Sequence, residues 1–339
     1  MNITVLGSGG WGTALALLLY ENDHRITLWS AFPEESEQLQ RTRENPYLSG
    51  VSLPEALICT ADIASVRNAD LVVLATPSFA VRETARAMRE HLNPGTPVVI
   101  VSKGIERETL RIFSHVVQDE LGDIARVAAL SGPSHAEEVS RGIPTACVAV
   151  SDDLAVAELV QDAFMNKRFR VYSSTDVIGV ELGAALKNVI AIAAGASDGL
   201  GCGDNTIAAL MTRGLDEIAT LAVALGGKRE TLAGLAGLGD LIVTCTSRHS
   251  RNRRAGVLIG KGAGVEGAMQ QVGGVVEGYY AAGAACALAE RAGVEMPICK
   301  EIYRVLYEDK DPGQVVKDLM TRGKRSEHRD PAAMEWVNR

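Results

Sequence analysis

Two charged residues in the second half of the sequence stand among small and aliphatic side chains. Lys187 lies within the apolar stretch Gly183–Ile192. Asp240 directly follows the glycine-rich run Gly234–Gly239. Burial lowers the pKa of a lysine toward neutrality, which suits its amine for proton transfer, and a neighbouring carboxylate can hold the ammonium form. The alternatives are a lysine whose amine reaches solvent from an apolar stem and an aspartate that caps a helix.

A dense basic cluster follows Asp240 in a chain whose formal net charge is −8. It consists of Arg248, Arg251, Arg253 and Arg254. Arginine binds phosphate oxygens two at a time, so the cluster is a candidate anchor for a phosphorylated small molecule. A solvent-exposed helix start is the alternative. Nucleic acid is disfavoured as a partner because no stacking aromatic residues accompany the cluster and the net charge repels a polyanion.

The first residues of the chain have the pattern of a dinucleotide-binding turn. Asn2–Leu6 is a β-branched run, the glycine pattern Gly7-x-Gly9-x-x-Gly12 follows, and Trp11–Leu19 is an apolar helical stretch. In such a strand, turn and helix the glycines permit a tight turn, a close approach of the pyrophosphate and close helix packing. The helix amides then attract the phosphates. An ordinary glycine turn is the alternative.

The end of the second expected strand does not decide between NAD and NADP. This strand is Arg25–Trp29, and Ser30 and Ala31 follow it. An acid at this place, about 20 residues past the glycines, binds the ribose hydroxyls of NAD in dinucleotide folds. No acid and no arginine stands there in this sequence, so both cofactors remain possible.

Short apolar runs alternate with helical segments up to residue 173, and only helical patterns follow. This order predicts a parallel sheet with helices on both faces, then a helical part. The expected fold is α/β: a Rossmann-type dinucleotide-binding domain over residues 1–174 and an all-α substrate and catalytic domain over residues 175–339, with a mobile tail over residues 322–339. The later strands are expected at Leu57–Thr60, Leu71–Ala75, Val98–Ser102, Arg126–Leu130, Thr145–Val150 and Arg170–Ser173, and the late helices at Asp176–Ser197, Thr206–Leu225, Tyr279–Ala292, Pro297–Tyr307 and Pro312–Thr321.

Two loops are expected near a ligand. Ser131–Glu137 follows an expected strand, and the carboxyl ends of parallel strands are where such sheets bind ligands. Ser134 and Glu137 have the spacing of a capping box, which would direct free helix amides at a ligand; a cap without a ligand is the alternative. Gln270–Gly278 is too glycine-rich for a helix and is expected to be a loop over a cleft, with Glu277 near the cofactor.

Cysteine and histidine usage indicates the compartment and the absence of a metal. The six cysteines are scattered without a C-x-x-C pair and no secretory leader is expected, which predicts free thiols in the cytoplasm. The six histidines have no metal-ligand spacing, so no metal is expected. The weakly charged stretch Val177–Ser197 is expected to be buried in protein and not inserted in a membrane.

Several different short motifs are spread over most of the chain, from residue 3 to residue 277. They are Gly7–Ala14, Asn45–Leu48 with Leu53–Pro54, Ser102–Ile105, Ser131–Ala136, Leu186–Val189, Gly237–Asp240 and Ser250–Asn252. Together they closely resemble the bacterial NAD(P)-dependent glycerol-3-phosphate dehydrogenases. The resemblance implies reversible hydride transfer between NAD(P)H and dihydroxyacetone phosphate, giving sn-glycerol 3-phosphate for phospholipid synthesis.

The resemblance also implies roles for single residues. Lys187 would be the general acid and base on the C2 oxygen, and Asp240 would steady its ammonium group. A basic residue often found in the family at about Ser30 is missing here, which weakens any preference for NADP. Substrate contacts are implied for Lys103, Gly132, Ser134, Lys187, Asp240, Ser250, Arg251 and Asn252, and cofactor contacts for Gly7, Gly9, Gly10, Trp11, Gly12, Lys103, Ala136, Arg251, Val275 and Glu277.

Two other functions remain as alternatives. A hydroxy-acid or hydroxyacyl-CoA dehydrogenase would share Lys187 and Asn188 without needing an Arg251–Asn252 anchor. A non-catalytic NAD sensor could dispense with Lys187 and Asp240 altogether. The small-residue helices of the second half are compatible with a homodimer, and the one other expected partner is the small phosphorylated substrate.

Overall fold

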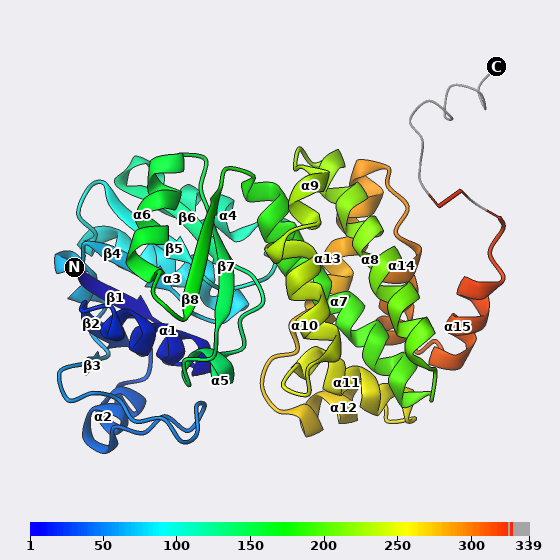
Figure 1. Ribbon diagram of the computed structural model, residues 1–339, viewed down its shortest axis with the longest axis horizontal. Helices are drawn as coiled ribbons and strands as arrows, with labels where there is room; N and C mark the ends of the chain where they lie inside the picture. The colour runs from blue at the N-terminus through cyan, green and yellow to red at the C-terminus, as the bar shows by residue number, and fades with distance from the viewer. Residues whose placement is uncertain (325, 328–339) are drawn as a thin grey trace.

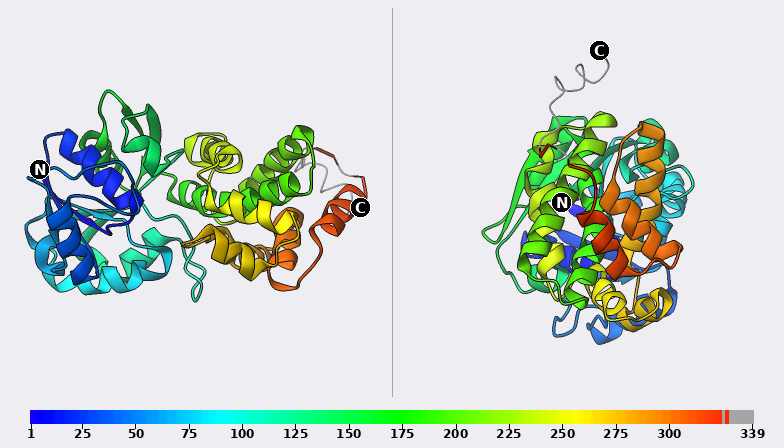
Figure 2. Two further views of the ribbon diagram at one scale, coloured as in Figure 1. Left: turned by 90° about the horizontal axis from the view of Figure 1, so that it is seen from below. Right: turned by 90° about the vertical axis from the view of Figure 1, so that its right-hand side faces the viewer.

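The computed structural model describes residues 1–324 and 326–327 and contains an α/β region followed by a helical region. The two regions lie side by side along the long axis of the molecule (Figures 1 and 2). This arrangement confirms the predicted fold class. The expected mobile tail over residues 322–339 lies mostly outside the described residues.

The α/β region is built on one sheet of eight described strands in the order β3-β2-β1-β4-β5-β6-β7-β8. In the centre of the sheet, Ile3 on β1 lies between Ile26 on β2 and Leu71 on β4. Neighbouring strands are parallel except for β6 and β7. The strands are β1 (Asn2–Leu6), β2 (Arg25–Trp29), β3 (Ile58–Thr60), β4 (Leu71–Leu74), β5 (Thr96–Ile100), β6 (Ala125–Ser131), β7 (Thr145–Val150) and β8 (Phe169–Ser174).

The antiparallel β6–β7 pair departs from the predicted parallel sheet. The connection between Ser131 and Thr145 contains a single short helix, α5 (Ala136–Val139). A parallel return needs a crossover across the face of the sheet, usually a full helix. One helical turn is too short for this, so the chain turns back and the loop after β6 stays at the carboxyl edge of the sheet.

Helices cover both faces of this sheet, which explains why the central strands are apolar throughout. One face packs against α1 (Gly10–Glu21) and α6 (Leu154–Phe164). The other face packs against α3 (Val81–Met88) and α4 (Phe113–Leu121). The remaining helical segments include α2 (Pro33–Thr42) and 3₁₀ turns at Ile63–Asn68, Ser78–Ala80, Arg89–His91 and Gly122–Ile124.

The helical region surrounds one long central helix, α7 (Val177–Gly199). Among the described helices only α7 is long and apolar enough to cross a membrane, yet 94% of its most apolar window is buried inside the protein. Its neighbours include α8, α10, α11, α13 and α14. The other helices are α8 (Asp204–Ala224), α9 (Arg229–Leu232), a π turn (Leu235–Gly239), α10 (Asp240–Thr246), α11 (Arg251–Gly260), α12 (Val265–Val272), α13 (Glu277–Ala292), α14 (Pro297–Tyr307) and α15 (Pro312–Met320).

Glycines let α7 and α11 lie with their backbones in contact. A Cβ atom on Gly195 would lie 2.1 Å from the Arg253 carbonyl oxygen, and one on Gly256 would lie 2.2 Å from the Ile192 carbonyl oxygen. Distances this short exclude any side chain at these two positions. The crossing fixes α11, and therefore the arginine cluster, relative to the helix that carries Lys187.

One apolar core continues from the sheet into the helical region. It joins Leu74 and Ile100 on one sheet face to Val180, Val189 and Ile218 of α7 and α8. A second core fills the opposite sheet face. The two regions therefore share interior side chains and are not connected by a linker alone.

Candidate active site

Loops from four parallel strands meet at the carboxyl edge of the sheet, as the strand order requires. A Cβ atom on Gly7, after β1, would lie 2.5 Å from the Ala75 carbonyl oxygen, after β4. Ser102 Oγ, after β5, donates to the Thr76 carbonyl oxygen at 2.5 Å. Lys103 Nζ donates to the Gly132 carbonyl oxygen, after β6, at 2.9 Å. This edge faces the helical region.

The glycine turn has the geometry that a dinucleotide requires. Gly7 has a φ of +124°, and a Cβ atom on Gly12 would lie 1.9 Å from the Gly7 carbonyl oxygen. No atom of the described residues lies within 4 Å of a Cβ position on Gly9. The described part of the chain therefore leaves the space in front of Gly9 open at the start of α1, and none of its side chains caps the helix amides there. These features fit a bound pyrophosphate.

The other predicted cofactor residues of this part lie close to the turn. Gly10 is the first residue of α1, and its Cβ position lies 3.9 Å from Cβ of Ala136 on α5. Trp11 follows it, and its indole nitrogen is buried without a hydrogen-bond partner among the described residues. The structure thus brings Gly10, Trp11 and Ala136 together with an unused donor.

Lys187, Asp240 and the partly buried Lys103 form one hydrogen-bonded group between the two regions. Lys187 Nζ donates to Asp240 Oδ1, and Lys103 Nζ donates to Asp240 Oδ2 at 2.8 Å. Lys187 and Asp240 are only 4% and 1% exposed. The lysine amine therefore does not reach solvent, so the snorkelling alternative is wrong.

A backbone turn places the Asp240 carboxylate in this position. The π turn Leu235–Gly239 ends where α10 begins, and a Cβ atom on Gly237 would lie 2.1 Å from the Leu232 carbonyl oxygen. Asp240 is the first residue of α10, after Gly239 at the N-cap, and its carboxylate is occupied by two ammonium groups. The helix-cap alternative for Asp240 is therefore wrong.

The electrostatics of the group favour proton exchange near neutrality. Burial lowers the pKa of Lys187 to about 7, and Lys103 acts in the same direction, whereas Asp240 opposes the change. Burial disfavours ionisation of Asp240, but the two ammonium groups outweigh it and lower the pKa of its carboxyl. Asp240 therefore stays ionised while Lys187 can gain or lose a proton.

Thr244 and His135 also lie at this site, although neither was predicted from the sequence. Thr244 Oγ1 accepts from Lys187 Nζ at 2.9 Å and donates to the Asp240 carbonyl oxygen at 2.6 Å. The signal for Thr244 was its position four residues after Asp240 on one helix. The ring of His135 lies 6.0 Å from that of His249, and its Nε2 is buried without a partner among the described residues. That histidine lies within the Ser131–Ala136 motif, but no role was predicted for it.

Ser134 is bound differently from the predicted capping box. The N-cap of α5 is His135, and no side chain caps this helix. Ser134 Oγ instead donates to the Gly132 carbonyl oxygen at 2.9 Å and accepts from Lys103 Nζ at 3.4 Å. The capping box is wrong because α5 begins one residue later than its spacing requires. Gly132 and Ser134 lie beside Lys103 as a consequence.

The predicted phosphate anchor lies at the start of α11. Ser250 is the N-cap and accepts from the Arg253 amide at 3.2 Å. Asn252 is buried; its side chain donates to Asn188 Oδ1 at 2.9 Å and accepts from the Gly278 amide at 2.8 Å. Arg251 is exposed at the helix start. Asn252 therefore links α11 to the residue next to Lys187.

The loop after α12 is shorter than predicted. Gln270–Gly278 was expected to be a loop, but α12 continues to Val272 and α13 begins at Glu277. The connecting residues include Gly274, whose Cβ position lies 2.7 Å from Arg251 Nη1, and Val275. The structure thus brings Arg251, Val275 and Glu277 to one place.

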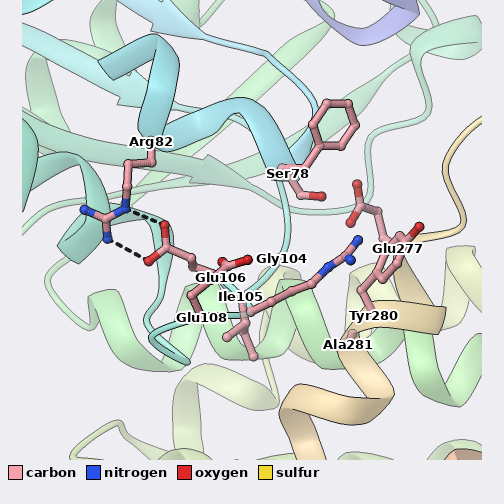
Figure 3. A pocket seen from close by; sticks show the side chains of 11 residues that line it. Ser78, Arg82, Gly104, Ile105, Glu106, Glu108, Glu277, Tyr280 and Ala281 are labelled. Atoms are coloured by element: carbon pink, nitrogen blue, oxygen red, sulfur yellow. Dashed lines mark hydrogen bonds and ion pairs between the residues drawn. The ribbon is translucent and has the colours of Figure 1, made fainter. Parts of the chain in front are cut away.

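A cavity of about 140 Å³ lies next to Glu277, between the two regions. Figure 3 shows Ser78 and Glu277 facing each other across it, with Glu106 and Tyr280 on its wall. Burial raises the pKa of Glu277, whereas the neighbouring Ser78 acts in the opposite direction. The Arg107 guanidinium lies 3.3 Å from the centre of the Tyr280 ring. Both regions therefore form the walls of this cavity.

Family models match most of the chain on both sides of this site. The model described as NAD-dependent glycerol-3-phosphate dehydrogenase N-terminus matches residues 2–157, and the model described as the C-terminus matches residues 176–317. The chain belongs to the NAD-dependent glycerol-3-phosphate dehydrogenase family. The described residues include no group of histidine, cysteine, aspartate or glutamate side chains that could hold a metal ion.

Curated relatives and solved structures agree with this membership. The glycerol-3-phosphate dehydrogenase [NAD(P)+] of Moorella thermoacetica is 55% identical over 96% of this chain and 97% of its own length. That of Geobacillus thermodenitrificans is 50% identical over 97% of each chain. The crystal structure of glycerol-3-phosphate dehydrogenase from Coxiella burnetii has a TM-score of 0.91 at 40% identity, over 95% of this chain and 99% of that one.

In this glycerol-3-phosphate dehydrogenase family member, a carboxylate does stand at the end of β2. Ser30 Oγ donates to Glu35 Oε2 at 2.7 Å. This acid was not predicted because Glu35 lies five residues beyond Ser30, on α2. The first turn of that helix brings Glu35 back toward the strand. The interpretation that this place lacks a carboxylate is therefore wrong.

Proposed function

We propose that the chain catalyses reversible hydride transfer between NAD(P)H and dihydroxyacetone phosphate, giving sn-glycerol 3-phosphate. The hydrogen-bonded group formed by Lys187, Asp240 and Lys103 carries the proposal, because it stands at the edge of the sheet where the glycine turn lies. The family models and the names of the relatives support the same reaction. A nicotinamide supplies or accepts the hydride when it is bound.

Lys187 is the proposed acid and base of this reaction. Reduction of a ketone leaves an alkoxide at C2 that must gain a proton as it forms, and the Lys187 ammonium supplies one. In the reverse direction the neutral amine removes the proton from the C2 hydroxyl. Asp240 stabilises the ammonium form of Lys187. Lys103, which binds the other oxygen of the Asp240 carboxylate, polarises the C2 carbonyl. Gly132 and Ser134 hold polar substrate atoms beside Lys103.

The start of α11 is the proposed anchor for the substrate phosphate. Arg251 is free to contact a dianion because it is exposed, and Ser250 and Asn252 flank it. The buried bond between Asn252 and Asn188 fixes the distance from this anchor to Lys187. Binding energy from the phosphate is thereby used to orient C2.

The glycine turn and the residues around it form the proposed cofactor site. Gly7, Gly9, Gly10, Trp11 and Gly12 hold the dinucleotide phosphates at the start of α1. Lys103, Ala136, Arg251, Val275 and Glu277 are the remaining proposed contacts. The unpartnered Trp11 nitrogen and the open space at Gly9 support this assignment.

We also propose a role in phospholipid synthesis, a cytoplasmic location and a division into domains at residues 174 and 175. All six cysteines are free, which suits a reducing compartment. Residue 174 ends β8, and α7 begins at residue 177. The homodimer stays a prediction. The glycines of α7 and α11, which belong to the small-residue helices that suggested it, contact each other's helix within one chain.

Steady-state kinetics test the proposal. Wild-type protein should consume NADH or NADPH when dihydroxyacetone phosphate is added, whereas a non-catalytic sensor would give no loss of absorbance. We expect Lys187→Ala to abolish turnover with cofactor affinity intact, and Arg251→Ala to raise KM mainly. Lys261→Ala is the matched control, since this exposed basic residue lies at the other end of α11. A kcat near wild type in Lys187→Ala would refute the lysine assignment.

A further inference from the structure

The end of β2 adjoins the glycine turn. The Gly7 amide donates to the carbonyl oxygen of Trp29, the last residue of β2, at 2.9 Å. Ser30 follows Trp29 and is buried. Ser30 is therefore one residue beyond the strand that pairs with the glycine turn. In dinucleotide-binding folds the adenosine ribose binds at this place.

Ser30 connects this place to Glu35 by a short chain of hydrogen bonds. The Phe32 amide donates to Ser30 Oγ at 3.3 Å, and Ser30 Oγ donates to Glu35 Oε2 at 2.7 Å. No other hydrogen bond or ion pair from the described residues reaches the Glu35 carboxylate. Its Oε1 is therefore available to accept from a ligand hydroxyl.

Acidic residues open the helix that carries Glu35. Pro33 opens α2, and Glu34 and Glu35 both lie in its first turn. Arg43, at the far end of α2, binds the carbonyl oxygens of Leu57 and Glu55 and does not neutralise these acids.

We infer that Glu35, positioned by its hydrogen bond from Ser30, binds the adenosine ribose hydroxyls and selects NAD over NADP. An ionised carboxylate accepts a hydrogen bond from the 2′-hydroxyl of NAD. The same carboxylate repels the 2′-phosphate of NADP, and Glu34 adds a second negative charge to that turn. The inference rests on the proposed function, since it requires a dinucleotide at the glycine turn.

Direct titration of cofactor fluorescence tests the inference without turnover. We expect wild-type protein to bind NADH at least about tenfold more tightly than NADPH. Glu35→Gln should weaken NADH and tighten NADPH, and Glu35→Arg should reverse the preference. Ser30→Ala should weaken NADH while NADPH changes less. Glu37→Gln, two residues along the exposed side of α2, is the matched control and should leave both affinities unchanged.

The outcomes separate this inference from the proposed function. Equal affinities of the wild type for NADH and NADPH, or equal behaviour of Glu35→Gln and Glu37→Gln, would overturn the ribose assignment while leaving the reaction intact. Absence of binding by both cofactors would overturn the proposed function together with this inference. Circular dichroism of each variant confirms that α2 is still folded.

Discussion

At the scale of single residues, one carboxylate serves two ammonium groups. Asp240 contacts both Lys103 and Lys187, so neither lysine has a counter-ion of its own. Burial and the charge of Lys103 both act against the ammonium form of Lys187, and its pKa falls to about 7. A lysine in this state can donate or accept a proton at physiological pH.

We expect the two directions of the reaction to depend oppositely on pH. Ketone reduction needs the Lys187 ammonium, so its kcat/KM should fall as pH rises through about 7. Alcohol oxidation needs the neutral amine, so its kcat/KM should rise over the same range. Initial rates in both directions, in mildly acidic to mildly alkaline buffers, measure this. The substrate phosphate also titrates, near pH 6, but in the same sense for both substrates. Parallel profiles would contradict the assignment.

Asp240→Asn should lower kcat by about 10²-fold to 10³-fold, because it removes the charge that holds the Lys187 ammonium. The midpoint of the pH profile should also move lower, since Asp240 raises the pKa of Lys187. Thr244→Val is the control: it removes one neutral bond to the same amine and should cost less than about tenfold. A kcat for Asp240→Asn within a few fold of wild type would argue against a shared counter-ion.

Residues of this site differ in how far the sequence could predict them. Lys187 and Asp240 were identified because a charge among apolar neighbours is unusual in sequence alone. Glu35 and His135 reach the site through turns whose geometry depends on tertiary packing. The roles implied by the family resemblance for the remaining site residues stay predictions.

At the scale of elements, the crossing of α7 and α11 determines where the phosphate anchor stands. Backbone contact at Gly195 and Gly256 leaves no freedom to rotate α11 about its axis without a clash. A substitution at this helix crossing should therefore shift the positions of Arg251 and Asn252 without contacting them.

Gly256→Ala should lower the free energy of unfolding by about 1–3 kcal/mol, because its Cβ atom would lie 2.2 Å from a backbone oxygen. Gly267→Ala on α12 is the matched control, since nothing lies within 4 Å of its Cβ position. There alanine should be neutral or slightly stabilising. Urea denaturation of the two variants measures the difference, and equal stability would show that the helices can separate at low cost.

Helices and strands were predictable where the sequence pattern of the segment itself determines its structure. The predicted Thr145–Val150 strand and Pro297–Tyr307 helix have the observed bounds. The strand predicted at Val98–Ser102 is shifted, because β5 starts at Thr96 and Ser102 instead bonds to the loop after β4. The direction of β7 was not predictable from composition, since it depends on the length of helix in the preceding connection.

At the scale of the whole molecule, Glu181 joins the two regions. Its carboxylate, on α7, accepts from the amide and hydroxyl of Ser114 at the start of α4. Burial raises the pKa of Glu181 to about 7, against the effect of these hydrogen bonds. The joint between the regions therefore contains a titratable group.

The free energy of unfolding should fall as pH rises from about 4.5 to about 7. In this window the folded protein keeps a proton on Glu181 that the unfolded chain has lost, and the contribution reaches at most about 3 kcal/mol. Glu181→Gln should flatten this slope, whereas Glu230→Gln, at an exposed position on α9, should not. Urea titrations at several pH values measure this dependence of stability on pH. An unchanged slope in Glu181→Gln would exclude the Glu181 carboxyl as the source of the pH dependence.

The core that continues from the sheet into α7 and α8 restricts how ligands can enter. A hinge motion that swung the regions apart as rigid halves would expose aliphatic side chains to water, at a cost that grows with the area uncovered. Capture and release of ligands should therefore depend on rearrangement of short connections at the rim, such as residues 273–276. Calorimetry should accordingly record one melting event for the entire polypeptide, with no separate transition for either half.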